Sequence, residues 1–261
     1  MSSKLYMSFG AMALALVACS EDNVGGTSVE PNTTYAEGYW LWNPLAGDLS
    51  VNTARYAALL PEDVEADGHW FWETKGDDDD GGRSYVEWPV KLGSGVDSLS
   101  TVIESCQGIC GIASLVKAGM TYNPYVGVGF VIARDETGNP TPVDVSNWGG
   151  VCITYSSEAI PSLVLDLGDS LRKVFDDGAS FPAVSMPRSS SEITKCFAWS
   201  AFKIPSWRNI LPEPWETEAG WRASKQLVGL VFRIQSTSGE YRFNIRYVGT
   251  KEEYGTNIKY P

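Results

Sequence analysis

Residues 225–249, KQLVGLVFRIQSTSGEYRFNIRYVG, contain two stretches, 227–235 and 240–248, in which β-branched and aromatic side chains alternate with other residues. Such stretches, bounded by turn-forming residues, are typical of short strands. Six more occur earlier in the chain, at 84–91, 111–118, 126–133, 150–156, 162–167 and 195–199. Eight short strands with turn-rich connections predict an all-β fold, a two-sheet jelly-roll sandwich.

Helices are expected to be few and short, and the best candidates are residues 53–60 and 216–226. The segment GYWLW at 38–42 is similar in sequence to GHWFW at 68–72, but two copies do not make a repeat protein. The first copy is either an additional edge element or part of a hairpin-and-helix collar. We therefore separate an N-terminal extension of undefined structure, residues 38–67, from a jelly roll at 68–261.

The amino terminus has the pattern of a bacterial lipoprotein signal. Residues 1–18 combine Lys4 with an apolar stretch that is too short for a permanent membrane span, and Cys19 follows directly. An ordinary secretory peptide is the alternative. Residues 19–37 would be the lipidated cysteine and a flexible polar tether, because they are rich in Gly, Ser, Thr and Asn. We expect a protein anchored by lipid to the outer membrane or the cell surface.

The chain is acidic, with a formal net charge of −12 over 261 residues. Such a chain repels phosphate backbones, and it lacks a basic stripe, so nucleic acid is not an expected partner.

Four cysteines remain once Cys19 is lipidated, and an even number in an exported chain favours two disulfides. Three pairings are open. We prefer Cys106 with Cys110, which closes a tight loop, and Cys152 with Cys196, which joins two strands. A zinc site is the alternative, although the cysteine spacing differs from the usual two-residue pair.

The period of two in strands predicts which side chains share a face. In GVCITYSS, Val151, Ile153 and Tyr155 share the more apolar face, and Cys152 lies on the other. In SLVLDLG the leucines alternate with Val164 and Asp166, which places a carboxylate on the more open face.

Five segments together resemble a known group of folds: YVGVGFVIA (125–133), SNWGGVCITYSS (146–157), PSLVLDLGD (161–169), FAWSAFKIPSW (197–207) and residues 225–249. Their order and spacing resemble the galactose-binding-like jelly rolls of carbohydrate-binding module family 11 and the complex I intermediate-associated protein superfamily. The resemblance covers residues 68–249 and implies a cleft on a concave sheet that binds β-glucan. Tyrosines would stack on sugar rings there, with carboxylates, histidine and arginine binding hydroxyls.

Ten tryptophans and twelve tyrosines supply aromatic surface of the kind that packs on sugar rings. Five tryptophans lie in or beside strands, and most of them are expected in the core: Trp70, Trp72, Trp88, Trp148 and Trp199. Any single aromatic residue can equally be structural. The candidate ligand-binding residues are Tyr122, Tyr155, Asp166, Trp207, Trp215 and Trp221.

The aspartate run at 77–80 admits two interpretations. Asp77 and Asp79 could hold a structural calcium, because carboxylates are hard oxygen ligands. The run lacks EF-hand spacing, however, and an acidic solvated turn is the alternative.

Catalysis has little support in the sequence. The sole histidine, His69, has no nucleophile motif nearby, and no pair of carboxylates is singled out for glycoside hydrolysis. We therefore expect a non-catalytic, lipid-anchored protein that binds plant cell-wall polysaccharide, such as β-glucan or cellulose. A structural subunit of an envelope complex and a glycoside hydrolase are the alternatives.

Overall fold

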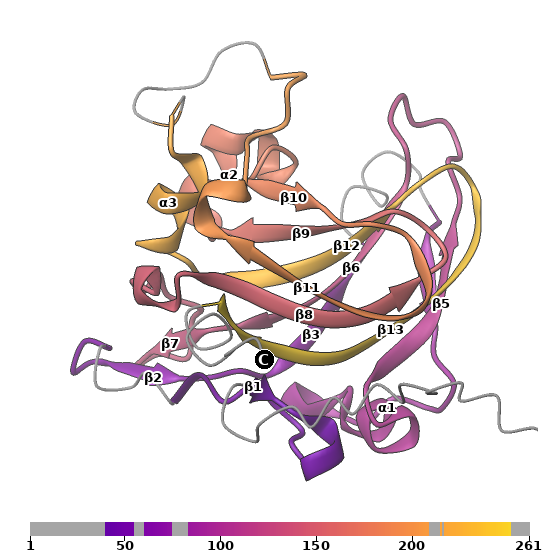
Figure 1. Ribbon diagram of the computed structural model, residues 1–261, viewed down its shortest axis with the longest axis horizontal. Coiled ribbons are helices and arrows are strands. Elements are labelled where there is room, and N and C mark those ends of the chain that lie inside the picture. The colour runs from indigo at the N-terminus through magenta and orange to yellow at the C-terminus, as the bar shows by residue number, and fades with distance from the viewer. Residues whose placement is uncertain (1–39, 55–59, 75–82, 209–214, 216, 252–261) are drawn as a thin grey trace, which may run out of the picture. The chain divides into compact units, whose positions relative to one another are not determined.

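The computed structural model describes residues 40–54, 60–74, 83–208, 215 and 217–251 (Figure 1). The chain divides into two compact units, residues 1–35 and 36–261, and every described residue belongs to the second. This unit is built from β-sheets with a few short helices, so the predicted all-β jelly-roll sandwich is confirmed.

Two antiparallel sheets form the sandwich. The six-stranded sheet has the order β11-β8-β13-β5-β4, with β1 also paired to β13, and the five-stranded sheet has the order β10-β9-β12-β6-β3. A separate two-stranded sheet joins β2 to β7. The strands are β1 (Trp40–Trp42), β2 (Val64–Ala66), β3 (Trp70–Glu73), β4 (Tyr85–Glu87), β5 (Ile109–Leu115), β6 (Tyr125–Val131), β7 (Ala133–Asp135), β8 (Gly150–Ser157), β9 (Pro161–Asp166), β10 (Ala183–Ser185), β11 (Ser189–Ala198), β12 (Gly229–Gln235) and β13 (Gly239–Thr250).

The core lies between the two sheets, and the predicted faces of β8 are correct. Val151, Ile153 and Tyr155 of β8 are all buried, and Tyr155 is 0% exposed. The Tyr155 ring packs edge-on against Phe232 of β12, with 5.6 Å between centroids, and its hydroxyl donates to the carbonyl of Pro187. Burial raises the pKa of Tyr155 to about 12, because the phenolate would lose its hydration.

The two tryptophan-rich stretches pack against each other from opposite sheets. The first forms β1, an additional edge strand beside β13, and the second forms β3 at the edge of the five-stranded sheet. Trp42 and Trp70 meet across the core with 4.7 Å between ring centroids, and Trp70 also contacts Phe130. Residues 40–42 are therefore part of the sandwich.

A glycine fixes the chain just before β3. Gly68 has φ +86°, and a Cβ at this position would lie 1.8 Å from the carbonyl oxygen of Val51. Its own carbonyl accepts a hydrogen bond of 2.9 Å from the Val51 N–H. Only a residue without a side chain allows this approach, and it sets the position at which His69 leaves the loop.

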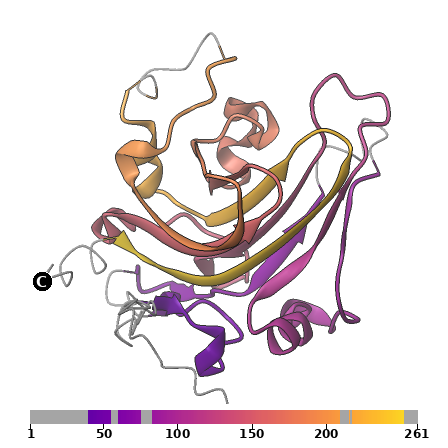
Figure 2. The same cartoon turned by 45° about the vertical axis from the view of Figure 1, so that its right-hand side comes forward.

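The helices α1 (Ser100–Cys106), α2 (Asp169–Arg172) and α3 (Ala219–Ser224) are all short. The helix expected at 216–226 is confirmed as α3, whereas residues 55–59 of the one expected at 53–60 lie outside the described residues. In both views α2 and α3 lie on one side of the strands and α1 on the other (Figures 1 and 2). Within the described ranges, no helix is long and apolar enough to cross a membrane.

Both preferred disulfides are present. Cys106–Cys110 links the end of α1 to β5, and Cys152–Cys196 joins β8 to β11 with 4.0 Å between Cα atoms. The second bridge lies on the more polar face of its strands, as predicted from the period of two.

We expect the two bridges to differ in their contribution to stability. The Cys152–Cys196 bridge spans 44 residues and Cys106–Cys110 only 4. Loop-closure entropy predicts that Cys152→Ala/Cys196→Ala lowers the free energy of unfolding by about 4 kcal/mol. The matched pair Cys106→Ala/Cys110→Ala should lower it by about 2 kcal/mol. Urea denaturation of both variants checks the order, and an equal loss would contradict it.

Candidate functional site

The outer face of the five-stranded sheet, turned away from the core, carries aligned rows of side chains. Because Val128, Phe130 and their partners point into the core, the alternate residues point outward. The strand register places Phe71 of β3 beside Gly129 of β6, and next to them Val231 of β12 and Val164 of β9, in that order.

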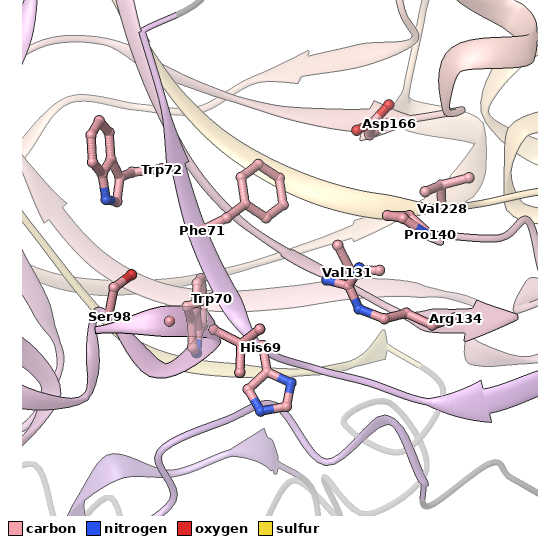
Figure 3. A pocket seen from close by; sticks show the side chains of 12 residues that line it. His69, Trp70, Phe71, Trp72, Ser98, Val131, Arg134, Pro140, Asp166 and Val228 are labelled. Carbon is pink, nitrogen blue, oxygen red and sulfur yellow. The ribbon is translucent and has the colours of Figure 1, made fainter. Parts of the chain in front are cut away.

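One half of this outer face is covered. Val164 and Val231 are only 2% exposed, and Phe175, Phe181 and Trp215 from the segment between β9 and β12 are buried as well. The other half, around Phe71, is open. A pocket of about 400 Å³ lies there (Figure 3).

The pocket begins on the outer face and continues around the edge strand β3. Phe71 projects toward Val228 and Asp166, whereas Trp72 projects to the other side of the strand (Figure 3). Trp72 is 43% exposed and Phe71 is half-buried. The lining residues are His69, Trp70, Phe71, Trp72, Gly95, Val96, Ser98, Val131, Arg134, Pro140, Asp166 and Val228.

Gly129 makes room for the Phe71 ring. A Cβ at position 129 would lie 2.9 Å from Cζ of Phe71 and 2.4 Å from the carbonyl oxygen of Leu230. The absence of a side chain therefore lets the ring lie low over the neighbouring strand, with one face left toward the pocket.

A buried carboxylate organises one end of the pocket. The side chain of Asp67 is 3% exposed and contacts both Nδ1 of His69 and Nε of Arg134. It also accepts the backbone N–H of His69 at 3.0 Å, while Nη1 of Arg134 donates to the carbonyl of Gly138 at 2.9 Å. On its outer side, His69 Nε2 lies 3.2 Å from Oδ1 of Asp97. Asp67 thus holds the two basic side chains that line this end.

A tight turn supports Arg134. Oδ1 of Asp135 accepts hydrogen bonds from the hydroxyl and backbone N–H of Thr137 and from the backbone N–H of Asn139. The Thr137 hydroxyl and then the Asn139 N–H are the main reasons that the pKa of Asp135 lies below its ordinary value. The turn leads directly to Pro140, which also lines the pocket.

A second carboxylate marks the opposite end. Asp166, at the end of β9, has a side chain that is 15% exposed and lies 3.5 Å from Nη2 of Arg172. Its Oδ1 accepts the backbone N–H of Gly168 at 2.9 Å. Polar groups thus stand at both ends of the pocket, and apolar side chains lie between them.

A further polar row follows on the same outer face. Arg233 lies with its guanidinium carbon 4.6 Å from the centroid of Tyr125 and Nη2 3.8 Å from Oε1 of Glu73. Glu73 lies over Gly127, where a Cβ would be 2.8 Å from its Cγ. These side chains fill the face beside the pocket.

The structure brings only one of the six predicted ligand-binding residues to this pocket, and that residue is Asp166. Tyr155 is fully buried and Trp215 is 7% exposed, packed edge-on against Phe175 at 5.0 Å. Neither has ring surface on which a ligand could pack, so burial removes both from the site. Tyr122, Trp207 and Trp221 are exposed but do not line the pocket.

Sequence reasoning missed Phe71, Trp72 and Arg134. The expectation that most of the five strand tryptophans lie in the core is correct, since Trp70, Trp148 and Trp199 are buried, but Trp72 is an exception. At the edge of the sheet Trp72 has no neighbouring strand on one side to cover it. The aromatic run at 69–72 was the feature of the sequence that could have pointed to Phe71 and Trp72 as binding residues.

Asp77 and Asp79, the candidate calcium ligands, lie outside the described residues. In the ranges that the structure describes, no group of three or more His, Cys, Asp or Glu side chains is arranged to hold a metal ion.

No protein family model matches the sequence, and no curated protein is significantly similar to it. Among solved structures, the family 11 carbohydrate-binding module of the cellulosomal cellulase Lic26A-Cel5E of Clostridium thermocellum is 14% identical, over 70% of this chain and 87% of the module, with a TM-score of 0.40. A family 29 carbohydrate-binding module is 11% identical, over 66% of this chain and 82% of its own, with a TM-score of 0.28. An exo-β-agarase is 8% identical, over 82% of this chain but 26% of its own, with a TM-score of 0.31. Because these identities and TM-scores are low, function has to be argued from the residues of the site.

Asp67 should contribute to stability as well as to the site. Asp67→Ala leaves His69 and Arg134 without their shared carboxylate, and because both bases are partly exposed we expect a loss of about 2 kcal/mol in the free energy of unfolding. Asp97→Ala, which removes a carboxylate that is 63% exposed, should change it by less than about 1 kcal/mol. Thermal and urea unfolding measure both, and equal effects would show that Asp67 is not the organising group.

Proposed function

We propose that this protein is a non-catalytic glycan-binding protein and that the pocket beside Phe71 is its binding site. The observation that carries the proposal is the combination, in one open pocket, of aromatic surface with polar side chains at both ends. The rings are Phe71 and Trp72, and the polar groups are His69, Arg134 and Asp166.

Sugars suit this arrangement because they have two kinds of surface. Their C–H faces pack on aromatic rings, and their hydroxyl rims exchange hydrogen bonds with polar side chains. The guanidinium N–H groups of Arg134 can donate to hydroxyl oxygens, while the Asp166 carboxylate can accept from hydroxyl groups. A flat apolar ligand would displace water from these polar groups without replacing its hydrogen bonds, so the pocket favours a polyhydroxylated ligand.

We propose plant cell-wall polysaccharide, such as β-glucan or cellulose, as the ligand class. The pocket continues around the edge strand from Phe71 to Trp72, which suits a chain of several sugar units better than a single one. The carboxylates at the pocket are engaged with cationic side chains, Asp67 with Arg134 and Asp166 with Arg172. Side chains engaged in this way hold the site in shape, which supports binding without hydrolysis.

The lipid anchor belongs to the same proposal. Acyl chains on Cys19 would hold the domain at the outer membrane or the cell surface, and many copies on one surface would raise the effective affinity for a polymer. A protein anchored in this way would attach the cell to the polysaccharide that it binds.

Phe71 should be the main stacking residue. Phe71→Ala removes the ring over Gly129, and we expect about a tenfold loss of affinity for the best ligand of a β-glucan, cellulose, xylan and mannan panel. Trp221→Ala is the control, because it removes a larger ring that is 42% exposed but lies outside the pocket. Isothermal titration measures both variants.

An equal loss in the two variants would place the site elsewhere. No heat with any polysaccharide would instead favour a structural subunit of an envelope complex. Release of reducing sugar from any of them would overturn the non-catalytic part of the proposal.

The anchor has its own test. In a bacterial host with lipoprotein processing, the unchanged chain should fractionate with membranes and incorporate labelled fatty acid. Cys19→Ala should abolish the label, because it removes the thiol that would be acylated. Label that persists in this variant would contradict the proposed anchor.

A further inference from the structure

His69 contacts a carboxylate through each of its two ring nitrogens. Nδ1 contacts Oδ1 of Asp67, and Nε2 lies 3.2 Å from Oδ1 of Asp97. A carboxylate only accepts hydrogen bonds, and a neutral imidazole carries one N–H and one lone pair. Both contacts are therefore favourable together only when the imidazole is protonated.

The two carboxylates differ in how firmly they are held. Asp67 is 3% exposed and is fixed from two more sides, by Arg134 and by the backbone N–H of His69. Asp97 is 63% exposed and lies in η3, the 3-10 helix Gly95–Asp97. When the imidazole loses a proton, the remaining N–H therefore stays with Asp67. The lone pair of Nε2 then faces the negative charge of Asp97, and this contact is unfavourable.

The η3 segment forms one wall of the pocket. Gly95, Val96 and Ser98 line it, and a hydrogen bond of 2.8 Å from the Gly93 N–H to the Ser98 carbonyl closes this segment into a compact loop. Gly95 has φ +70° with no atom within 4 Å of its Cβ position, so that side of the turn faces open space.

We propose that His69 and Asp97 form a proton-dependent clasp that holds the η3 wall against β3, so that the pocket is complete while the imidazole is protonated and loosens when it loses its proton. The charged groups around His69 are Asp67 from the segment before β3, Asp97 from η3 and Arg134 from β7. Asp166 and Arg172 stand at the other end of the pocket. The consequence for ligand affinity rests on the proposed glycan site, but the clasp itself does not.

The chain contains a single histidine, so the Cε1–H of its imidazole gives one unambiguous NMR signal. We expect this signal and the backbone amide signals of residues 95–98 to shift together as the pH is varied without ligand. In Asp97→Asn the amide can donate to a neutral imidazole or accept from a protonated one, so the amides should no longer follow the imidazole. Glu62→Gln, an exposed carboxylate outside the network, should behave like the unchanged protein.

Affinity for the best glycan of the panel should be about two- to fivefold higher when the imidazole is protonated than when it is neutral, the effect of one exposed charge pair. Asp97→Asn should remove that difference. Amides at 95–98 that ignore the imidazole titration, or a pH dependence that persists in Asp97→Asn, would overturn the clasp. If no polysaccharide binds but the amides follow the imidazole, the clasp stands and the glycan proposal fails.

Discussion

The packing of Trp70 against Trp42 and Phe130 is the constraint on which the binding face depends. Once Trp70 points into the core, the alternation of a strand sends Phe71 to the outer face. A slip of one residue in the pairing of β3 with β6 would bury Phe71 and expose Trp70 instead. The packing of Trp70 in the core therefore determines that Phe71 faces outward, although Trp70 itself is almost completely buried.

The sequence was sufficient to predict which side chains are buried where a local pattern distinguishes the two faces of a strand. In GVCITYSS, apolar and small polar side chains alternate, and both the burial of Tyr155 and the cross-strand position of Cys152 followed from that pattern. It was insufficient in WFW at 70–72, where three aromatic residues in succession give no contrast between faces. Only the edge position of β3 leaves Trp72 exposed, and that depends on pairing with a distant strand.

The polar end of the pocket could not be predicted for a related reason. Asp67 and Arg134 are 67 residues apart and meet because β2 pairs with β7, two strands of three residues each with little pattern of their own. Trp215 is a similar case, because it lies in an apparently exposed loop but is buried against Phe175, 40 residues earlier in the chain. Contacts of this kind are properties of the assembled fold.

A buried carboxylate between two bases is an expensive way to stabilise a protein, because its loss of hydration cancels much of the attraction. Apolar residues of similar volume would stabilise the loop before β3 equally well, but they would hold neither His69 nor Arg134 in place. The arrangement therefore makes better sense as a support for the pocket, because Asp67 fixes the side chains of His69 and Arg134 before a ligand arrives. A hydroxyl-rich ligand makes weak contacts, and little of their free energy is available to order the protein. Such a ligand therefore requires polar side chains and an aromatic ring that are already held in place.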